Sequence, residues 1–197
     1  MVITDPSKLY FTSDTHFFHK NIIKYAGRPF ADVNQMNYTL IDNWNKKVPE
    51  DGIVFHLGDF AFASKHQILG LTTALHGQIH LVIGNHDWNI IRDKITGGFA
   101  SVELEQYISV SDGQKIILNH FPMLCYGGSY YDKPIWQLFG HVHSGPNDPH
   151  KGLDTNRLQY LFPSQYDVGV DNNNYTPISY FELKAIINKQ IEKSKQQ

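Results

Sequence analysis

The sequence predicts an α/β fold in one domain that spans residues 1–197. Three observations lead to this prediction. In the first half of the chain, short apolar runs typical of buried strands alternate with amphipathic segments of helical period. Strand-like segments dominate the second half. The 197 residues fit one domain of ordinary size, and the 41% that are hydrophobic can fill its core.

Three strands and three helices are predicted in alternation in the first half. The strands are apolar runs over residues 8–13, 53–57 and 78–83. The helices cover residues 21–26, 33–47 and 65–75. Gly27 ends the first of these helices, Asp32 caps the second and Ser64 caps the third.

The second half is predicted to contain five strands, a long loop and one helix. The strands cover residues 99–104, 106–110, 114–118, 135–139 and 166–171, with a hairpin turn at Asp112-Gly113. Residues 144–165 form a long polar loop. Ser179 and Glu182 have the spacing of a capping box, which predicts a helix to about residue 190, followed by a solvated tail.

The bulk properties are typical of a cytoplasmic protein. The formal net charge of −2 provides no general attraction to nucleic acid, although a local basic patch remains open. Cys125 is the one cysteine, so no intramolecular disulfide forms and a reducing compartment is expected. No apolar run approaches the roughly 20 residues of a membrane span, and residues 1–5 lack the features of a signal peptide. We therefore expect no membrane partner.

Polar residues of metal-ligand type follow five of the predicted strands. They are Asp14, His16, Asp59, Asn85, His120, His141 and His143. In extended backbone, residues two apart point to the same side, so Asp14 and His16 are expected to aim at one point. Imidazole and carboxylate ligands suit first-row transition metals. Seven ligands exceed one tetrahedral site and suit two ions that share a carboxylate, for which phosphate ester hydrolysis is the leading chemistry.

His56 differs from these residues because it lies inside a predicted strand. We expect it to be a hydrogen-bonded histidine of the core.

The motifs Asp14-x-His16, Gly58-Asp59, Gly84-Asn85-His86-Asp87, His120 and Gly140-His141-x-His143 resemble, in order, the five signatures of the calcineurin-like metallophosphoesterase superfamily. The resemblance implies a two-sheet β-sandwich flanked by helices. It implies that Asp14, His16 and His143 bind one metal ion and that Asn85, His120 and His141 bind the other. Asp59 would bridge the ions together with a hydroxide that attacks phosphorus in line, and His86 would be catalytic. The cofactor would be two divalent transition-metal ions, with Mn favoured and Fe, Zn, Co or Ni also accepted by the ligands.

The sequence departs from the family pattern after the bridging residue. Many members of the family carry a further Asp three residues after it, which helps to orient the catalytic His, whereas this chain has Phe62. Asp87 is one candidate for that orienting role. The alternative is that Asp87 caps a helix that begins at Trp88.

The substrate is expected to be a small phosphomonoester or phosphodiester, nucleotides included. Arg28 is a candidate phosphate clamp, with a salt bridge as the alternative, and His19 a candidate for the rim of the site. The loop of residues 126–131 is expected to overhang the site, where its Tyr rings would stack a base or cover the core. A nuclease is a second reading, although the net charge disfavours it. A silent protein-binding scaffold is a third, weakened because all seven ligands and His86 are present.

Overall fold

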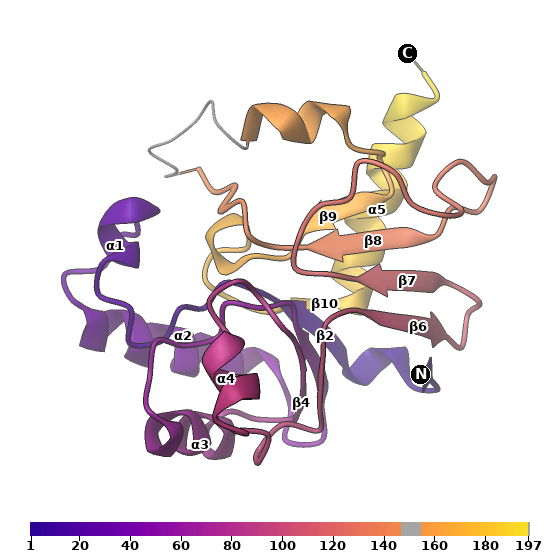
Figure 1. Ribbon diagram of the computed structural model, residues 1–197. Helices are drawn as coiled ribbons and strands as arrows, with labels where there is room; N and C mark the ends of the chain where they lie inside the picture. The colour runs from indigo at the N-terminus through magenta and orange to yellow at the C-terminus, as the bar shows by residue number, and fades with distance from the viewer. Residues whose placement is uncertain (147–154, 197) are drawn as a thin grey trace.

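The computed structural model describes residues 1–146 and 155–196, which form two five-stranded sheets with helices against them (Figure 1). Sheet I has the strand order β10-β2-β3-β4-β5 and sheet II the order β1-β6-β7-β8-β9. The strands are β1 (Val2–Ile3), β2 (Leu9–Thr12), β3 (Ile53–His56), β4 (Gln78–Val82), β5 (Ser101–Glu103), β6 (Gln106–Val110), β7 (Lys115–Leu118), β8 (Trp136–Phe139), β9 (Gln165–Asp167) and β10 (Ile178–Ser179). The helices are α1 (Ile22–Tyr25), α2 (Val33–Lys47), α3 (Lys65–Ala74), α4 (Trp88–Arg92) and α5 (Tyr180–Ser194), with 3₁₀ helices at Pro6–Lys8, Thr155–Tyr160 and Val170–Asn172.

Each sheet combines parallel and antiparallel pairs. In sheet I, β2 to β5 are parallel and β10 is antiparallel to β2. In sheet II, β7, β8 and β9 are parallel, and the predicted hairpin joins β6 and β7. The predicted α/β class is therefore confirmed, with two mixed sheets flanked by helices.

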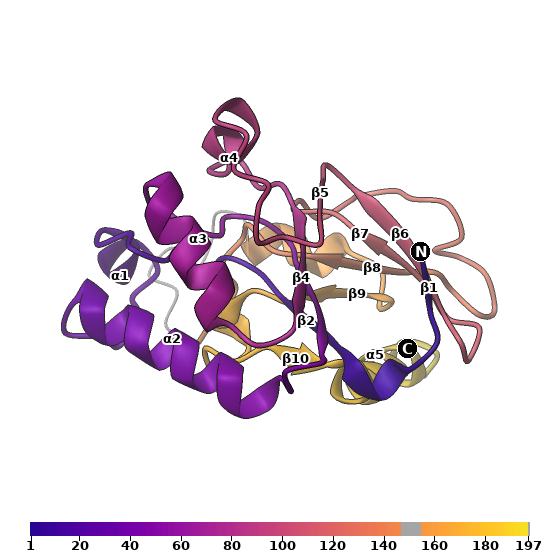
Figure 2. The ribbon, with the colours of Figure 1, turned by 90° about the horizontal axis from the view of Figure 1, so that it is seen from below.

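Strand alternation divides the core into two parts. Tyr10, Val54 and Ile79 stand side by side in the register of sheet I and pack into a core shared with α2 and α3. The adjacent residues Phe11 and Phe55 point to the opposite face, into a core shared with sheet II and α5. Figure 2 shows α2 and α3 together on one side of sheet I, away from β6 to β8. Both faces of sheet I are thus buried, which explains its nearly continuous apolar strands.

The helix starts agree with the predicted caps. The Asp32 carboxylate accepts backbone N–H bonds at the start of α2. Ser64 and Ser179 form capping boxes with the glutamine and the glutamate three residues later, at the starts of α3 and α5.

Three predicted segments differ from the structure. The expected loop of residues 144–165 contains the 3₁₀ helix Thr155–Tyr160, and its residues 147–154 lie outside the described part of the chain. The expected strand 166–171 ends at Asp167, because a 3₁₀ helix at Val170–Asn172 takes over. Helix α5 extends to Ser194, four residues beyond its expected end, because Ile187 is buried and Ile191 packs against the same core.

Among the described residues, no helix has both the length and the apolar character that a bilayer crossing requires.

Candidate metal centre

The candidate ligands follow the carboxyl ends of five strands that belong to both sheets. Asp14, Asp59 and Asn85 follow β2, β3 and β4 of sheet I, whereas His120 and the pair His141 and His143 follow β7 and β8 of sheet II. A parallel bridge between Ser13 and Gly169 joins the two sheets at this edge. All seven candidate ligands therefore lie at the same end of the sandwich.

The seven side chains converge into one connected cluster. One ligand atom from each of Asp14, His16 and His143 lies within 4.8 Å of the other two, and the same holds for Asp14, Asp59 and His120. Asn85 Oδ1 lies 2.9 Å from His120 Nε2 and 2.9 Å from His141 Nδ1.

The backbone at five of the seven candidate ligands is left-handed and not extended, which corrects the expectation that alternation along a strand aims Asp14 and His16. Positive φ angles occur at Asp14 (57°), His16 (49°), Asp59 (57°), His141 (70°) and His143 (48°). Left-handed backbone turns the side chain away from the direction that a strand would give it. Loop conformation, and not strand alternation, therefore brings these side chains together.

Two glycines of the motifs permit the loops to approach closely. A Cβ atom at Gly84 would lie 2.3 Å from Asp59 Oδ1, and one at Gly140 would lie 2.2 Å from Asp14 Oδ2. Any side chain at either position would displace a candidate ligand. The motif glycines are thus required by the packing of the site.

The donor set and its unpaired atoms fit divalent transition-metal ions. Among the described residues, four buried side-chain polar atoms have no hydrogen-bond partner, and Asp14 Oδ1 and His16 Nε2 are two of them. Both atoms belong to one cluster of candidate ligands. A buried carboxylate oxygen and imidazole nitrogen without partners are costly unless a cation occupies the space between them.

The electrostatics of the cluster also favour a cation. Burial raises the pKa of Asp59, and the nearby charge of Asp14 raises it further, because two carboxylates repel one another here. Burial lowers the pKa of His16 well below its ordinary value, which keeps its imidazole in the neutral form that binds metals.

Asp171 supports the candidate ligand His143 and was missed in the sequence. Its Oδ2 lies 2.7 Å from His143 Nδ1, so that His143 Nε2 faces Asp14 Oδ1 at 3.8 Å. Although burial alone would lower the pKa of His143, this hydrogen bond and the nearby carboxylates raise it to about 9. A carboxylate on the second ring nitrogen is the usual partner of a metal-bound histidine. Asp171 follows the end of β9, as the candidate ligands follow the ends of their strands. The predicted strand over residues 166–171 included Asp171, so the sequence did not mark it as a residue beyond a strand end.

The prediction that Arg28 clamps a substrate phosphate is wrong, because its side chain is fully buried. Its Nε and Nη2 atoms donate to the two carboxylate oxygens of Asp171, each at 2.9 Å. Its Nη1 and Nη2 donate to the backbone carbonyls of Thr15 and Asp14. Arg28 therefore takes the salt-bridge alternative and braces the first ligand loop from within.

Asp87 neither contacts the His86 ring nor caps α4 through its side chain. Its fully buried carboxylate accepts hydrogen bonds from the backbone N–H groups of Asp59, Phe60 and Gly84, at 2.6, 2.9 and 2.9 Å. Burial raises its pKa to about 6, although these hydrogen bonds act in the opposite direction. Asp87 thus ties the loop that carries Asp59 to the loop that carries His86.

His86 lies at the exposed side of the cluster, and its ring contacts are aromatic. Its side chain is 44% exposed, and its Nε2 lies 4.0 Å from Asp59 Oδ2. The Phe62 ring lies 4.9 Å from the His86 ring. Phe62 stands at the position where many members of the resembled family carry an orienting Asp, and it supplies an apolar wall in its place.

His19 lies at the rim, as expected. Its ring stacks on Phe62 at a centroid distance of 3.8 Å, and its Nδ1 is 3.2 Å from His16 Nδ1. Contact of His19 with a substrate stays a prediction.

The two remaining expectations have opposite outcomes. His56 is a fully buried core histidine, as predicted, with its Nε2 2.9 Å from Thr15 Oγ1. The Tyr-rich loop does not overhang the site. It leads to the amino end of β8, where Ile135 donates to the Gly128 carbonyl, and Tyr130 is 76% exposed.

Comparisons with known proteins give relatives whose names state no activity. No family model matches the chain. The chain is 35% identical over 184 residues to the uncharacterized protein MJ1445 of Methanocaldococcus jannaschii, and the match covers 92% of each chain. It is 30% identical over 163 residues to the Gene 66 protein of Mycobacterium phage L5, over 70% of this chain and 78% of that protein. Among solved structures it resembles the protein of unknown function AQ665 from Aquifex aeolicus, with a TM-score of 0.68 and 26% identity, over 90% of this chain and 98% of that one.

Proposed function

The chain belongs to the family of the uncharacterized protein MJ1445, and we propose that it is a dinuclear metal-dependent phosphoesterase with the calcineurin-like metallophosphoesterase fold. The observation that carries the proposal is the convergence of seven metal-type side chains into one cluster, in which the buried atoms Asp14 Oδ1 and His16 Nε2 have no hydrogen-bond partner. The two-sheet architecture with the cluster at the strand ends supports the fold assignment.

Two ions would share the cluster. Asp14, His16 and His143 would hold one ion, and Asn85, His120 and His141 would hold the other. Asp59 lies between the sets, because its Oδ2 is 3.5 Å from His16 Nε2 and 3.6 Å from His120 Nε2. Such a pair of ions, with Mn²⁺ as the first candidate, would lower the pKa of a water and neutralise phosphate charge.

The protein groups around the ions have separate tasks. Asp171 accepts from His143 Nδ1 and so keeps its Nε2 directed to the cluster. Asp87 holds the Asp59 loop through three backbone N–H groups. His86 is exposed to an arriving substrate and stands close to Asp59, where it would donate a proton to the oxygen of the leaving group. The substrate class is a small phosphate ester.

The test combines metal content with hydrolysis of bis-p-nitrophenyl phosphate and p-nitrophenyl phosphate, with and without Mn²⁺. The wild type is expected to bind about two ions and to cleave at least one ester. Asp59→Asn should lose both metal and activity, because the substitution removes the shared carboxylate charge. His86→Ala should keep the metal and lower kcat, by about 100-fold or more where the leaving oxygen needs a proton and by less for p-nitrophenolate.

The leaving group provides a sharper test of the role of His86. p-Nitrophenolate departs without a proton, whereas a less acidic alcohol needs one. The loss in His86→Ala should therefore be larger for an ester with an alkyl leaving group. His66→Ala, at an exposed histidine of α3, is the matched control and should change neither the metal content nor kcat. Metal binding without hydrolysis of any ester would contradict the proposed activity.

A further inference from the structure

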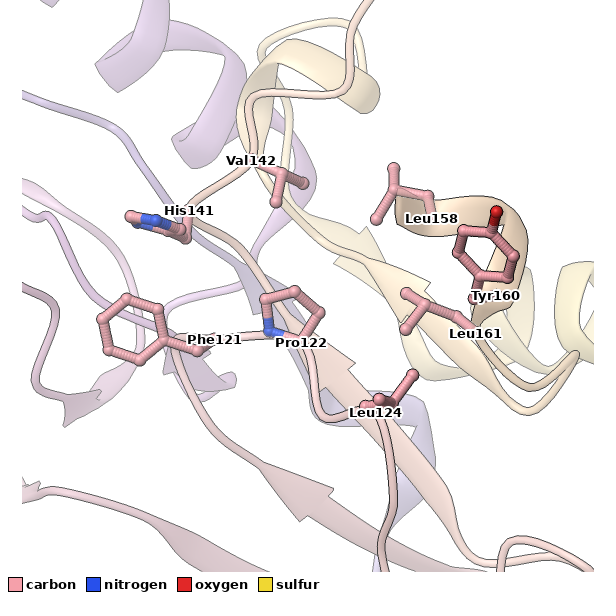
Figure 3. A pocket seen from close by; sticks show the side chains of 8 residues that line it. All are labelled: Phe121, Pro122, Leu124, His141, Val142, Leu158, Tyr160 and Leu161. Carbon is pink, nitrogen blue, oxygen red and sulfur yellow. The ribbon is translucent and has the colours of Figure 1, made fainter. Parts of the chain in front are cut away.

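A cavity of about 430 Å³ opens beside the candidate metal centre. Three segments line it: the residues that follow β7, the pair His141 and Val142, and the end of the 3₁₀ helix Thr155–Tyr160 with Leu161 after it (Figure 3). In this view Leu124, Leu158 and Leu161 lie around one side of the cavity, and Phe121 and His141 lie at the other. Its volume is in the range of small-molecule sites.

The described residues that line it are apolar, and none of them carries a charged side chain apart from the ionisable His141. Phe121, Leu124 and Tyr160 are 46%, 69% and 69% exposed, so large apolar side chains face solvent next to the metal-type cluster. A charged ligand group would lose its hydration against these apolar side chains. An uncharged apolar group would gain free energy from the same transfer.

The cavity is continuous with one side of the candidate metal centre. His141 lines the cavity, and its Nδ1 lies 2.9 Å from Asn85 Oδ1. The Phe121 ring lies 4.7 Å from the His141 ring and 4.9 Å from the His120 ring. A phosphate held at the cluster would therefore direct one substituent into the cavity.

The proton donor stands among different neighbours. The His86 ring lies 5.6 Å from the His16 ring and 4.9 Å from the Phe62 ring, and none of these three residues lines the cavity. A substituent that leaves beside His86 is thus distinct from one that occupies the cavity. The space beside His86 and the cavity can each receive one organic substituent. A phosphodiester has two such substituents, whereas a phosphomonoester has one.

We propose that this cavity binds the non-leaving substituent of a phosphodiester and that the preferred substituent is an uncharged ring. The proposal rests on the proposed phosphoesterase activity. In hydrolysis, the oxygen of one water forms a bond to phosphorus, the P–O bond to the leaving group breaks, and the leaving oxygen takes a proton. The substituent in the cavity stays on phosphorus, so the product is its monoester. A ring is large enough to displace water from the apolar walls, whereas a methyl group is not.

The experiment compares two diesters with the same leaving group, phenyl p-nitrophenyl phosphate and methyl p-nitrophenyl phosphate, in the Mn²⁺-loaded protein. We expect kcat/KM to be on the order of 10-fold higher for the phenyl ester, from the apolar surface buried. In parallel, calorimetry measures the binding of phenylphosphonate and methylphosphonate. The ratio of their affinities should show the same preference.

Two variants at one exposed position test the cavity itself. Leu124→Asn makes its wall polar and Leu124→Trp fills it, and both should bring the phenyl-to-methyl ratio close to 1 while activity on the methyl ester persists. Leu104 is also an exposed leucine, at 60%, and does not line the cavity. Leu104→Asn should therefore keep the wild-type ratio.

The outcomes separate the two proposals. Hydrolysis of both esters with an equal rate, or with a ratio that the Leu124 variants leave unchanged, overturns the cavity assignment and leaves the phosphoesterase intact. Hydrolysis of p-nitrophenyl phosphate but of neither diester also overturns the cavity assignment, and only the absence of all three activities overturns the phosphoesterase. Calorimetry then decides the cavity: tighter binding of phenylphosphonate that Leu124→Asn abolishes supports a ring site, and equal binding of the two phosphonates refutes it.

Discussion

Metal binding to Asp14, His16 and His143 should be strongly pH-dependent, because an ion must displace a proton from His143. Burial alone would lower the pKa of His143, but the hydrogen bond to Asp171 and the charges of Asp14 and Asp171 raise it to about 9 in the metal-free protein. A histidine binds metal only through a deprotonated nitrogen. At pH 7 only about 1% of molecules would hold a neutral His143, which weakens the apparent affinity by about 100-fold, or about 2.7 kcal/mol.

The affinity for Mn²⁺ is therefore expected to rise about tenfold from pH 7 to pH 8 and to level off near pH 9. Calorimetry in buffers of different ionisation enthalpy measures this rise together with the number of protons released, expected to be about one for the first ion at pH 7. Asp171→Asn removes the partner charge, lowers the pKa of His143 and should flatten the rise. An affinity that is equal at pH 7 and pH 8, without proton release, would refute the reasoning.

Three further predictions concern residues around the cluster. Arg28→Met should lower the free energy of unfolding by about 3 kcal/mol in urea denaturation, because the buried Asp171 carboxylate loses its two hydrogen bonds from Arg28 and keeps only His143 as a charged partner. Phe62→Ala should lower kcat by about 3- to 10-fold at unchanged metal content, because His86 loses the ring beside it, and Phe62→Tyr should restore the rate. Burial raises the pKa of Asp167 from 3.8 to about 6, so the folded metal-free protein holds this proton more tightly than the unfolded chain. That contribution to stability is complete below pH 3.8 and lost as the pH rises through 6, a decrease of about 3 kcal/mol that Asp167→Asn should abolish in denaturation curves.

The sequence predicted that the candidate ligands lie together, because parallel strands bring their carboxyl ends to one edge. Each ligand motif follows a strand whose apolar pattern is plain, so its place in space follows from the fold class. The same logic did not reach Asp171, because it lies in a 3₁₀ helix and the pattern of its neighbours is typical of a strand. A residue such as Asp171, which supports a candidate ligand without binding the metal itself, is not part of a motif with a fixed spacing in the sequence.

The remaining differences between the predicted and observed roles concern residues whose contact partners are distant in the sequence. The position of Arg28 near the first motif indicated proximity to the site but not the direction of its side chain, and its partner is 143 residues away. The role of Asp87 depends on the backbone of Asp59, 28 residues earlier, which no local pattern indicates. The contact of Phe62 with His86 likewise joins two loops that the fold brings together.

The left-handed backbone at five candidate ligands has a consequence for directed evolution. Each such conformation costs a residue with a side chain on the order of 1 kcal/mol, which glycine does not lose. Five of them together would cost about 5 kcal/mol, a large part of the 5–15 kcal/mol by which a typical domain is stable. Screens of the metal-free protein for heat resistance would therefore enrich glycine at Asp14, His16, Asp59, His141 and His143. The most thermostable survivors of such a screen would be the ones that can no longer hold a metal ion.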